Sequence, residues 1–188
     1  MRTNLIVVDD FYQNPDTVRE FALSQDFSVT GNYPGLRTRS FLSEDCINII
    51  NNLLTYSAGG VTNWLLDENS DGYTGSFQLC TSQDRTWIHT DQHNTWAGVC
   101  YLTPNAPVSG GTAIYKHKKS GERTFVQDSQ FEKDPYDYTE WEIVDRIGNI
   151  YNRLVLFRGD LYHASVDYFG NNANNGRLFQ LFFFNTAY

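Results

Sequence analysis

The sequence predicts an α+β fold that is mainly β, with helices packed on the outside of a β-sandwich or jelly roll. Two observations lead to this prediction. Up to Gly60, apolar residues recur at the three- and four-residue spacing of amphipathic helices. After Gly60, short aromatic and β-branched runs alternate with turn residues, which is typical of antiparallel strands. Helices followed by strands favour an α+β arrangement.

The chain is expected to form a single domain, because its 188 residues suit one domain with a sizeable core. Within residues 1–188, we expect residues 1–60 to form a helical support region and residues 61–188 to form the β core. Residues 117–152 are a long polar insertion between two expected strands, and such insertions often carry function. We interpret this segment as a candidate lid over a substrate.

The helical region begins with a short expected strand at residues 5–8. Asn14 and Pro15 then predict a helix start, since asparagine is a favoured N-cap and proline fits the first turn. Ser43 is the expected N-cap of a second helix, which should end before Gly59. The apolar residues at helical spacing predict the buried faces: Val18, Phe21 and Ala22 in the first helix, and Ile47, Ile50 and Leu54 in the second.

Seven strands are expected in the β core. Their ranges are Val61–Leu66, Ser76–Cys80, Thr86–His89, Trp96–Thr103, Thr112–Lys116, Leu154–Phe157 and Arg177–Phe184. Within the insertion, Thr139 and Glu142 form a capping-box pattern, and apolar residues follow at helical spacing. This pattern predicts a short helix at about Glu140–Ile147.

Charge and cysteine content argue against several classes of protein. The net charge of −8 argues against a general nucleic-acid binder, which needs a basic surface. The three cysteines (Cys46, Cys80 and Cys100) are odd in number and show no CxxC spacing, so neither a disulfide framework nor a cysteine zinc site is indicated. Reduced thiols suit a cytoplasmic protein. No segment approaches the ~20 apolar residues of a membrane span.

One basic run, Lys116 to Lys119 with Arg123 close behind, departs from this acidic composition. The simpler interpretation is a solvated loop or hairpin tip. The alternative is a local docking patch for an anionic substrate.

The residues with the clearest chemical meaning are His89 and Asp91. On an extended backbone, side chains two residues apart point the same way. His163 follows Asp91 after 163 − 91 = 72 residues and could complete three ligands on one face of a metal. Two histidines and one carboxylate that leave the opposite face open are the facial triad of non-haem Fe(II) oxygenases.

Each of these residues also has a simpler interpretation. A lone histidine on a strand is more often a hydrogen-bonded structural residue than a ligand, and Asp91 could cap a turn. His93 is a further candidate, because His89-x-Asp91-x-His93 would form a compact site without His163. We prefer His163, since a ligand from a distant strand end gives a more enclosed site.

Arg177 begins the last expected strand, 177 − 163 = 14 residues after His163. Alternation places it in line with apolar residues such as Phe179, and a buried arginine is costly without an anionic partner. Its planar fork could hold a carboxylate through two hydrogen bonds. An internal salt bridge or an exposed strand start is the alternative. The hydroxyl of Tyr101 could bind the same carboxylate, or Tyr101 could be a core residue with an internal partner.

The ordered set of motifs resembles the Fe(II)/2-oxoglutarate-dependent dioxygenase superfamily, and in particular its prolyl-hydroxylase-like branch. The likeness covers about residues 75–185. The opening residues 7–16 resemble a little-characterised bacterial and phage subgroup. The matching parts are His89-Thr90-Asp91, the strand ending Tyr101-Leu102, Gly110-Gly111-Thr112, the segment from Leu154 to His163, and Arg177 leading the last strand.

The resemblance implies a double-stranded β-helix, which is a jelly roll, with iron at its mouth. His89, Asp91 and His163 would be the catalytic residues that bind Fe(II). Arg177, assisted by Tyr101, would bind 2-oxoglutarate as a co-substrate. The implied activity is hydroxylation of a small molecule or a protein side chain in the cytoplasm, which is the host cytoplasm if a phage encodes the chain.

Two other functions stay open at this point. A non-catalytic jelly-roll module, for binding or as part of a virion, would not require the three metal-ligand candidates to converge. A cupin-like metalloenzyme that does not use 2-oxoglutarate would not need Arg177 near the metal.

Overall fold

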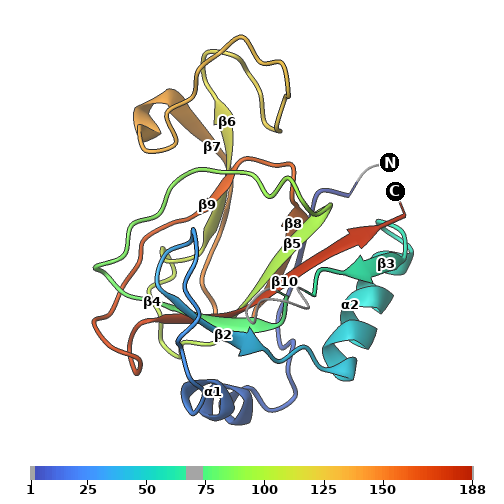
Figure 1. The fold of residues 1–188 in the computed structure, drawn as a ribbon, viewed down its shortest axis with the longest axis vertical. Coiled ribbons are helices and arrows are strands. Elements are labelled where there is room, and N and C mark those ends of the chain that lie inside the picture. Colours follow the sequence, from blue (N-terminus) through green and yellow to red (C-terminus); the bar gives the residue numbers. More distant parts are fainter. Residues whose placement is uncertain (1–2, 67–73, 188) are drawn as a thin grey trace.

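The computed structural model describes residues 3–66 and 74–187, which form two antiparallel sheets and two helices (Figure 1). The larger, seven-stranded sheet has the order β1-β8-β5-β10-β4-β2, with β3 also paired to β10. The smaller sheet has the order β7-β6-β9. The elements are β1 (Leu5–Val8), α1 (Pro15–Leu23), β2 (Leu36–Ser40), α2 (Glu44–Thr55), β3 (Val61–Trp64), β4 (Ser76–Cys80), β5 (Trp96–Tyr101), β6 (Thr112–His117), β7 (Trp141–Ile147), β8 (Leu154–Arg158), β9 (His163–Ser165) and β10 (Arg177–Thr186).

The central strands β5, β8 and β10 of the larger sheet are buried on both faces, and β10 contributes to both cores. Leu178 and Phe182 point into an outer core, which buried residues of α1 and α2 complete. Phe179 and Leu181 point into an inner core together with Ile114 and other residues of the smaller sheet. The long apolar run of β10 follows from this position, because a strand with two buried faces does not alternate with polar residues.

Both predicted helices are present, and they lie against the outer face of the larger sheet (Figure 1). Helix α1 begins at Pro15, and its Ala22 is fully buried. Helix α2 begins after Ser43, whose side chain accepts a hydrogen bond from the amide of Cys46. These elements confirm an α+β class that is mainly β, with the helices outside. No helix in the described part of the chain has the length and hydropathy needed to cross a membrane.

The first 60 residues contribute strands as well as helices. Strand β1 pairs with β8, and β2 pairs with β4 at the other edge of the larger sheet. Strand β2 is not predicted from the sequence, because its five residues, LRTRS, form a short and polar run. Gly35, just before this strand, adopts a φ of +68°, which favours glycine.

Residues 141–147 form a strand, so the helix expected at Glu140–Ile147 is wrong. Strand β7 pairs along its length with β6 and follows a single 3₁₀ turn at residues 138–140. The spacing of Trp141, Val144 and Ile147 fits a helix, but β-branched residues in this run also favour a strand. Pairing with β6 outweighs the local spacing, and this pairing cannot be read from the sequence alone.

Two smaller differences from the predicted strands concern the segments around His89 and His163. The strand expected at Thr86–His89 is not regular, and in it only His89 forms an isolated bridge, to His163. Strand β9 was not predicted, because it has only three residues. The remaining strands of the β core start where they were expected.

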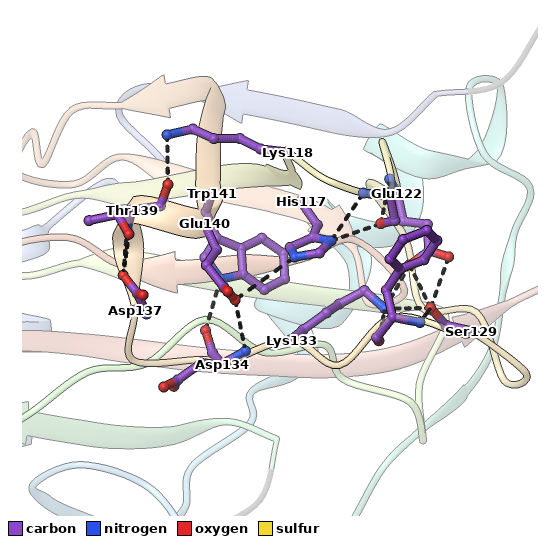
Figure 2. A network of polar contacts seen from close by, with 12 residues as sticks. His117, Lys118, Glu122, Ser129, Lys133, Asp134, Asp137, Thr139, Glu140 and Trp141 are labelled. Carbon is purple, nitrogen blue, oxygen red and sulfur yellow. Dashed lines mark hydrogen bonds and ion pairs between the residues drawn. The ribbon is translucent and has the colours of Figure 1, made fainter.

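The loop between β6 and β7 projects from the body of the molecule as an arm, at the top of Figure 1. Figure 2 shows the polar contacts that hold it. Lys133 pairs with Glu122 at 2.6 Å, and Ser129 donates a hydrogen bond to the same carboxylate. The basic run is also paired within the arm, since Lys116 contacts Glu142 at 2.7 Å and Lys118 donates to the Thr139 carbonyl. These contacts favour the hairpin-tip interpretation of the basic run.

Candidate metal centre

The main chain holds His89 and His163 opposite each other. The amide of each residue donates a hydrogen bond to the carbonyl oxygen of the other, at 3.0 and 2.9 Å. Residues directly opposite in an antiparallel pair project to the same side, so the two imidazole centroids lie 4.4 Å apart. Asp91 follows two residues after His89, and its amide donates to the carbonyl of Gly159 at 2.7 Å. The backbone thus brings all three side chains to one place.

The three side chains offer ligand atoms that lie within 4.8 Å of one another. Nε2 of His163 is 3.5 Å from Oδ2 of Asp91, and Nε2 of His89 is 3.9 Å from Oδ1. Atoms that share one ion with bonds of about 2.1 Å lie roughly 3 Å apart in neighbouring positions. The observed separations are longer, at 3.5 and 3.9 Å and up to 4.8 Å, so small side-chain movements would close the cluster around a single metal ion.

Hydrogen bonds to the main chain orient both imidazoles. Nδ1 of His89 lies 3.0 Å from the carbonyl oxygen of Trp87, and Nδ1 of His163 lies 2.9 Å from that of Leu161. Because a carbonyl only accepts, each Nδ1 carries the proton, and each Nε2 presents a lone pair to the shared space. Metal-binding histidines are oriented in this way.

His163 is neutral in this environment. Its side chain is 5% exposed, and burial lowers its pKa to about 4, with His89 adding to the effect and Asp91 opposing it. The neutral imidazole is the form that binds a metal. His163 is therefore ready to bind without first losing a proton at neutral pH.

The cluster opens into a cavity of about 500 Å³. Inner-face residues of the larger sheet, such as Phe179 and Leu181, line it together with the three ligand candidates. Sites for small molecules usually measure about 300–1,000 Å³. His93 also borders this cavity, but it is exposed, and the metal cluster found among the described residues does not include it.

Arg177 is fully buried beside this cavity. Its Nε donates to the carbonyl of Gly110 at 2.9 Å, and Nη2 donates to that of Gly111 at 3.3 Å. Nη1 is buried and has no hydrogen-bond partner among the described residues. The ring centre of Phe179, a cavity-lining residue, lies 4.3 Å from the guanidinium carbon. A buried cation with an unused donor is the arrangement that an anionic ligand would complete.

The two glycines beside Arg177 allow close approach of the main chain rather than only a turn. A Cβ at Gly111 would clash with the carbonyl oxygen of Ile147, and one at Gly110 would lie 2.7 Å from the ring of Phe169. Glycine is required here because the segment just before β6, which carries these carbonyls, packs against its neighbours without side-chain space. The carbonyl groups can therefore reach Arg177.

Tyr101 has an internal hydrogen-bond partner. Its hydroxyl lies 2.8 Å from Oγ1 of Thr112, and its ring centre lies 5.3 Å from the guanidinium carbon of Arg177. Thr112 borders the cavity, as does Tyr168, whose ring centre is 5.7 Å from the same carbon. Tyr168 cannot be recognised from the sequence, because it lies in an irregular segment where no periodic pattern marks it.

Structural neighbours of the whole chain are Fe(II)/2-oxoglutarate-dependent oxygenases, as the motifs predicted. HygX from Streptomyces hygroscopicus, solved with nickel and 2-oxoglutarate, has a TM-score of 0.61 at 9% identity, covering 99% of this chain and 84% of HygX. The Pseudomonas putida prolyl-4-hydroxylase has a TM-score of 0.51 at 14% identity, covering 98% and 94%. The Fe(II)/(alpha)ketoglutarate-dependent dioxygenase TqaL has a TM-score of 0.53 at 11% identity, covering 98% and 83%.

These identities are low, so the likeness concerns the fold. A search of curated proteins finds no match to the sequence. A family model does match, over residues 1–184, and its description is a family of unknown function, DUF6445. The chain therefore belongs to the family of unknown function DUF6445.

Proposed function

We propose that this protein is an Fe(II)- and 2-oxoglutarate-dependent oxygenase that hydroxylates a small molecule or a protein side chain. One observation supports it above all: His89, Asp91 and His163 converge in a cavity beside Arg177, whose Nη1 has no partner among the described residues. Neighbours of the same fold were solved with hygromycin B or with a peptide fragment bound, so both substrate classes stay in the proposal.

The proposed architecture is a single domain over residues 1–188 with a double-stranded β-helix as its core. Two antiparallel sheets that share the inner core support this arrangement. The cluster lies where segments next to both sheets meet, since His163 begins β9 of the smaller sheet and Asp91 contacts Gly159 just after β8. A jelly roll gathers side chains at such a mouth.

The residues present fit an iron ion. Two imidazoles and one carboxylate form the donor set typical of non-haem Fe(II), and the free cysteines Cys46, Cys80 and Cys100 are buried and not part of the cluster. In this proposal His89, Asp91 and His163 hold the ion and leave its other positions open. When bound, iron and 2-oxoglutarate supply the oxidising power for hydroxylation with O₂.

Arg177 is proposed to bind the distal carboxylate of 2-oxoglutarate. The carbonyls of Gly110 and Gly111 already hold two of its nitrogens, so the guanidinium cannot turn toward another partner. The unused Nη1 then provides a charge-assisted hydrogen bond to the carboxylate. Tyr101 is proposed to assist through Thr112, whose hydroxyl it contacts and which borders the cavity.

The apolar inner face has a second role in this proposal. Phe157, Phe179, Leu181 and Phe183 line the same cavity as the metal cluster. Their side chains exclude water from the space where the substrate carbon would react, which protects the oxidising chemistry from side reactions.

The test is an anaerobic titration of the protein with Fe(II) and 2-oxoglutarate, which should produce a weak visible charge-transfer band. His163→Ala is expected to remove the band, while the matched variant His93→Ala, which changes an exposed histidine outside the cluster, should keep it. Admission of O₂ should then release succinate. Absence of the band in the wild type, or an equal band in His163→Ala, contradicts the proposal and favours a non-catalytic module or another metalloenzyme.

A further inference from the structure

A second cavity adjoins the metal cavity. It has a volume of about 730 Å³, and Ser165 and Tyr168 line both cavities. Its walls include Arg85, from the segment after β4, and Tyr136 and Tyr138, from the arm. A substrate that extends beyond the metal cavity on this side would contact these side chains.

A row of flat side chains connects the metal cluster with this second cavity. Ile88 is buried, whereas its neighbour Trp87 borders the metal cavity with its ring centre 5.9 Å from that of His89. The rings of Trp87 and Tyr136 are 6.2 Å apart, and the guanidinium carbon of Arg85 lies 4.5 Å from the ring centre of Tyr136. These ring contacts join His89 of the metal cluster to Arg85 and Tyr136, which line the second cavity.

The tyrosines at the far end are exposed but held in place. Tyr136 is 45% exposed and Tyr138 is 40% exposed. The carboxylate of Asp134 accepts a hydrogen bond from the Tyr136 amide. The main-chain carbonyl of Asp134 accepts a second one from the indole of Trp141, and Figure 2 shows this second bond. Tyr138 packs edge-on against buried Tyr115 at 5.9 Å. Because these contacts already restrict the two tyrosines, binding of a ligand that stacks on their rings costs little side-chain entropy of the protein.

The charges around the second cavity are balanced. Arg85 and Arg146 oppose Asp84 and Asp167, and Arg146 lies 3.6 Å from Asp167. Balanced charge favours a neutral ligand over an ionic one. Aromatic faces surrounded by hydroxyl, guanidinium and carboxylate groups match a ligand with apolar C–H faces and a rim of hydroxyl groups. A sugar ring has both features.

A peptide strand fits this cavity less well. Peptides that bind by adding a strand need free main-chain groups along an edge. The amides of Ile88 and His89 already donate to the carbonyls of Pro135 and His163, and the amide of Val166 donates to Gly111. These three amides are therefore not free to pair with a peptide, which favours recognition by side chains on this side of the cavity.

We propose that the second cavity binds a sugar ring of the substrate, while the carbon to be hydroxylated lies at the metal cluster. The position of the reacting carbon rests on the proposed function. The sugar site itself does not require turnover and can be tested in the absence of metal and 2-oxoglutarate.

The whole chain, without added metal, is screened on an array of immobilised mono- to tetrasaccharides and on a peptide array, and the glycan that binds best is titrated by calorimetry. Tyr136→Ala should weaken its binding about tenfold, because one stacking surface is lost, while Tyr136→Phe should retain most of the affinity. The matched control is Tyr56→Ala. Tyr56 is 98% exposed at the end of α2, outside both cavities, and its loss should not change binding.

Absence of glycan binding, or equal affinity in the wild type and Tyr136→Ala, overturns the sugar site. Binding of a peptide that Tyr136→Ala weakens also overturns it. Glycan binding that depends on Tyr136 in a protein that releases no succinate supports the sugar site and rejects the oxygenase. Succinate release without any glycan binding supports the oxygenase and rejects the sugar site.

Discussion

The two faces of strand β10 each bury a polar side chain, and the two side chains differ in how their hydrogen bonds are met. On the outer face, Gln180 donates to the carbonyl of Gly75 at 2.9 Å and accepts a hydrogen bond from the hydroxyl of Tyr12. On the inner face, Arg177 keeps one buried nitrogen without a partner among the described residues. Since buried polar groups are nearly always paired, the paired Gln180 suits a closed core, and the unpaired Nη1 of Arg177 fits the ligand-binding role proposed for the inner face.

The largest expected difference between substitutions on the two faces of β10 is in the free energy of unfolding. Phe182→Ala on the fully buried outer face should lower the free energy of unfolding by about 3–5 kcal/mol, because it leaves a cavity in a closed core. Phe183→Ala on the inner face should cost less, because Phe183 already borders a cavity. Urea unfolding of both variants measures the difference. Equal losses would show that the inner core is packed as tightly as the outer one.

A second expected effect is a loss of stability in acid through His163. Its pKa is lowered from 6.5 to about 4 in the folded protein, so the unfolded chain binds more protons between these values. The contribution of His163 to the free energy of unfolding is therefore fully present above pH 6.5. About 3 kcal/mol of it is lost as the pH falls toward 4. Urea unfolding of the metal-free protein from pH 7 to pH 4 measures it. Carboxylates with lowered pKa, such as Asp9, add a loss of the same sign.

The matched variant for this pH profile is His163→Gln, which removes the titrating group. The stability of the wild type should fall more steeply than that of the variant between pH 6.5 and pH 4. Parallel profiles would mean that burial does not hold His163 neutral.

Arg177→Met should weaken 2-oxoglutarate binding about 10–100-fold, since one charge-assisted hydrogen bond of roughly 1.5–3 kcal/mol is lost. Calorimetric titration of the Fe(II)-loaded protein without oxygen measures this. The matched control on the opposite face is Gln180→Met, which should lower stability but leave 2-oxoglutarate binding unchanged. The same loss of affinity in both variants would end the distinction between the two faces.

Tyr101→Phe tests the smallest effect. Loss of its hydrogen bond to Thr112 should lower the free energy of unfolding by about 0.5–1.5 kcal/mol. If Tyr101 assists Arg177 through Thr112, the affinity for 2-oxoglutarate should also fall, by less than in Arg177→Met. Unchanged affinity in Tyr101→Phe would leave Tyr101 with a purely structural role.

The sequence was sufficient for features that depend on residue type and local order. Ser43 and Pro15 marked the two helix starts correctly, because capping chemistry is local. The spacing of His89 and Asp91 predicted their common direction, because alternation along a chain is local as well. The choice of His163 as the third ligand rested on the family resemblance and on the preference for an enclosed site. The structure places all three side chains together.

Other features required pairing between distant segments, which no local pattern records. Strand β7 has a helical apolar spacing, yet six of its residues pair with β6. The second cavity combines residues 82–86 with residues 136–146 and 165–168, and their neighbourhood depends on how the arm packs. The tyrosines there look like ordinary loop residues in the sequence, so only their placement suggested a ligand.

Strand β10 lies in the middle of the larger sheet, between β5 and β4, although it follows all of its partners in the chain. During translation, β4 and β5 are therefore made long before the strand that joins them. Their unpaired edges are templates for pairing with other chains until residues 177–186 leave the ribosome. The same strand begins with Arg177, so the closure of the sheet and the proposed carboxylate site both depend on this last segment.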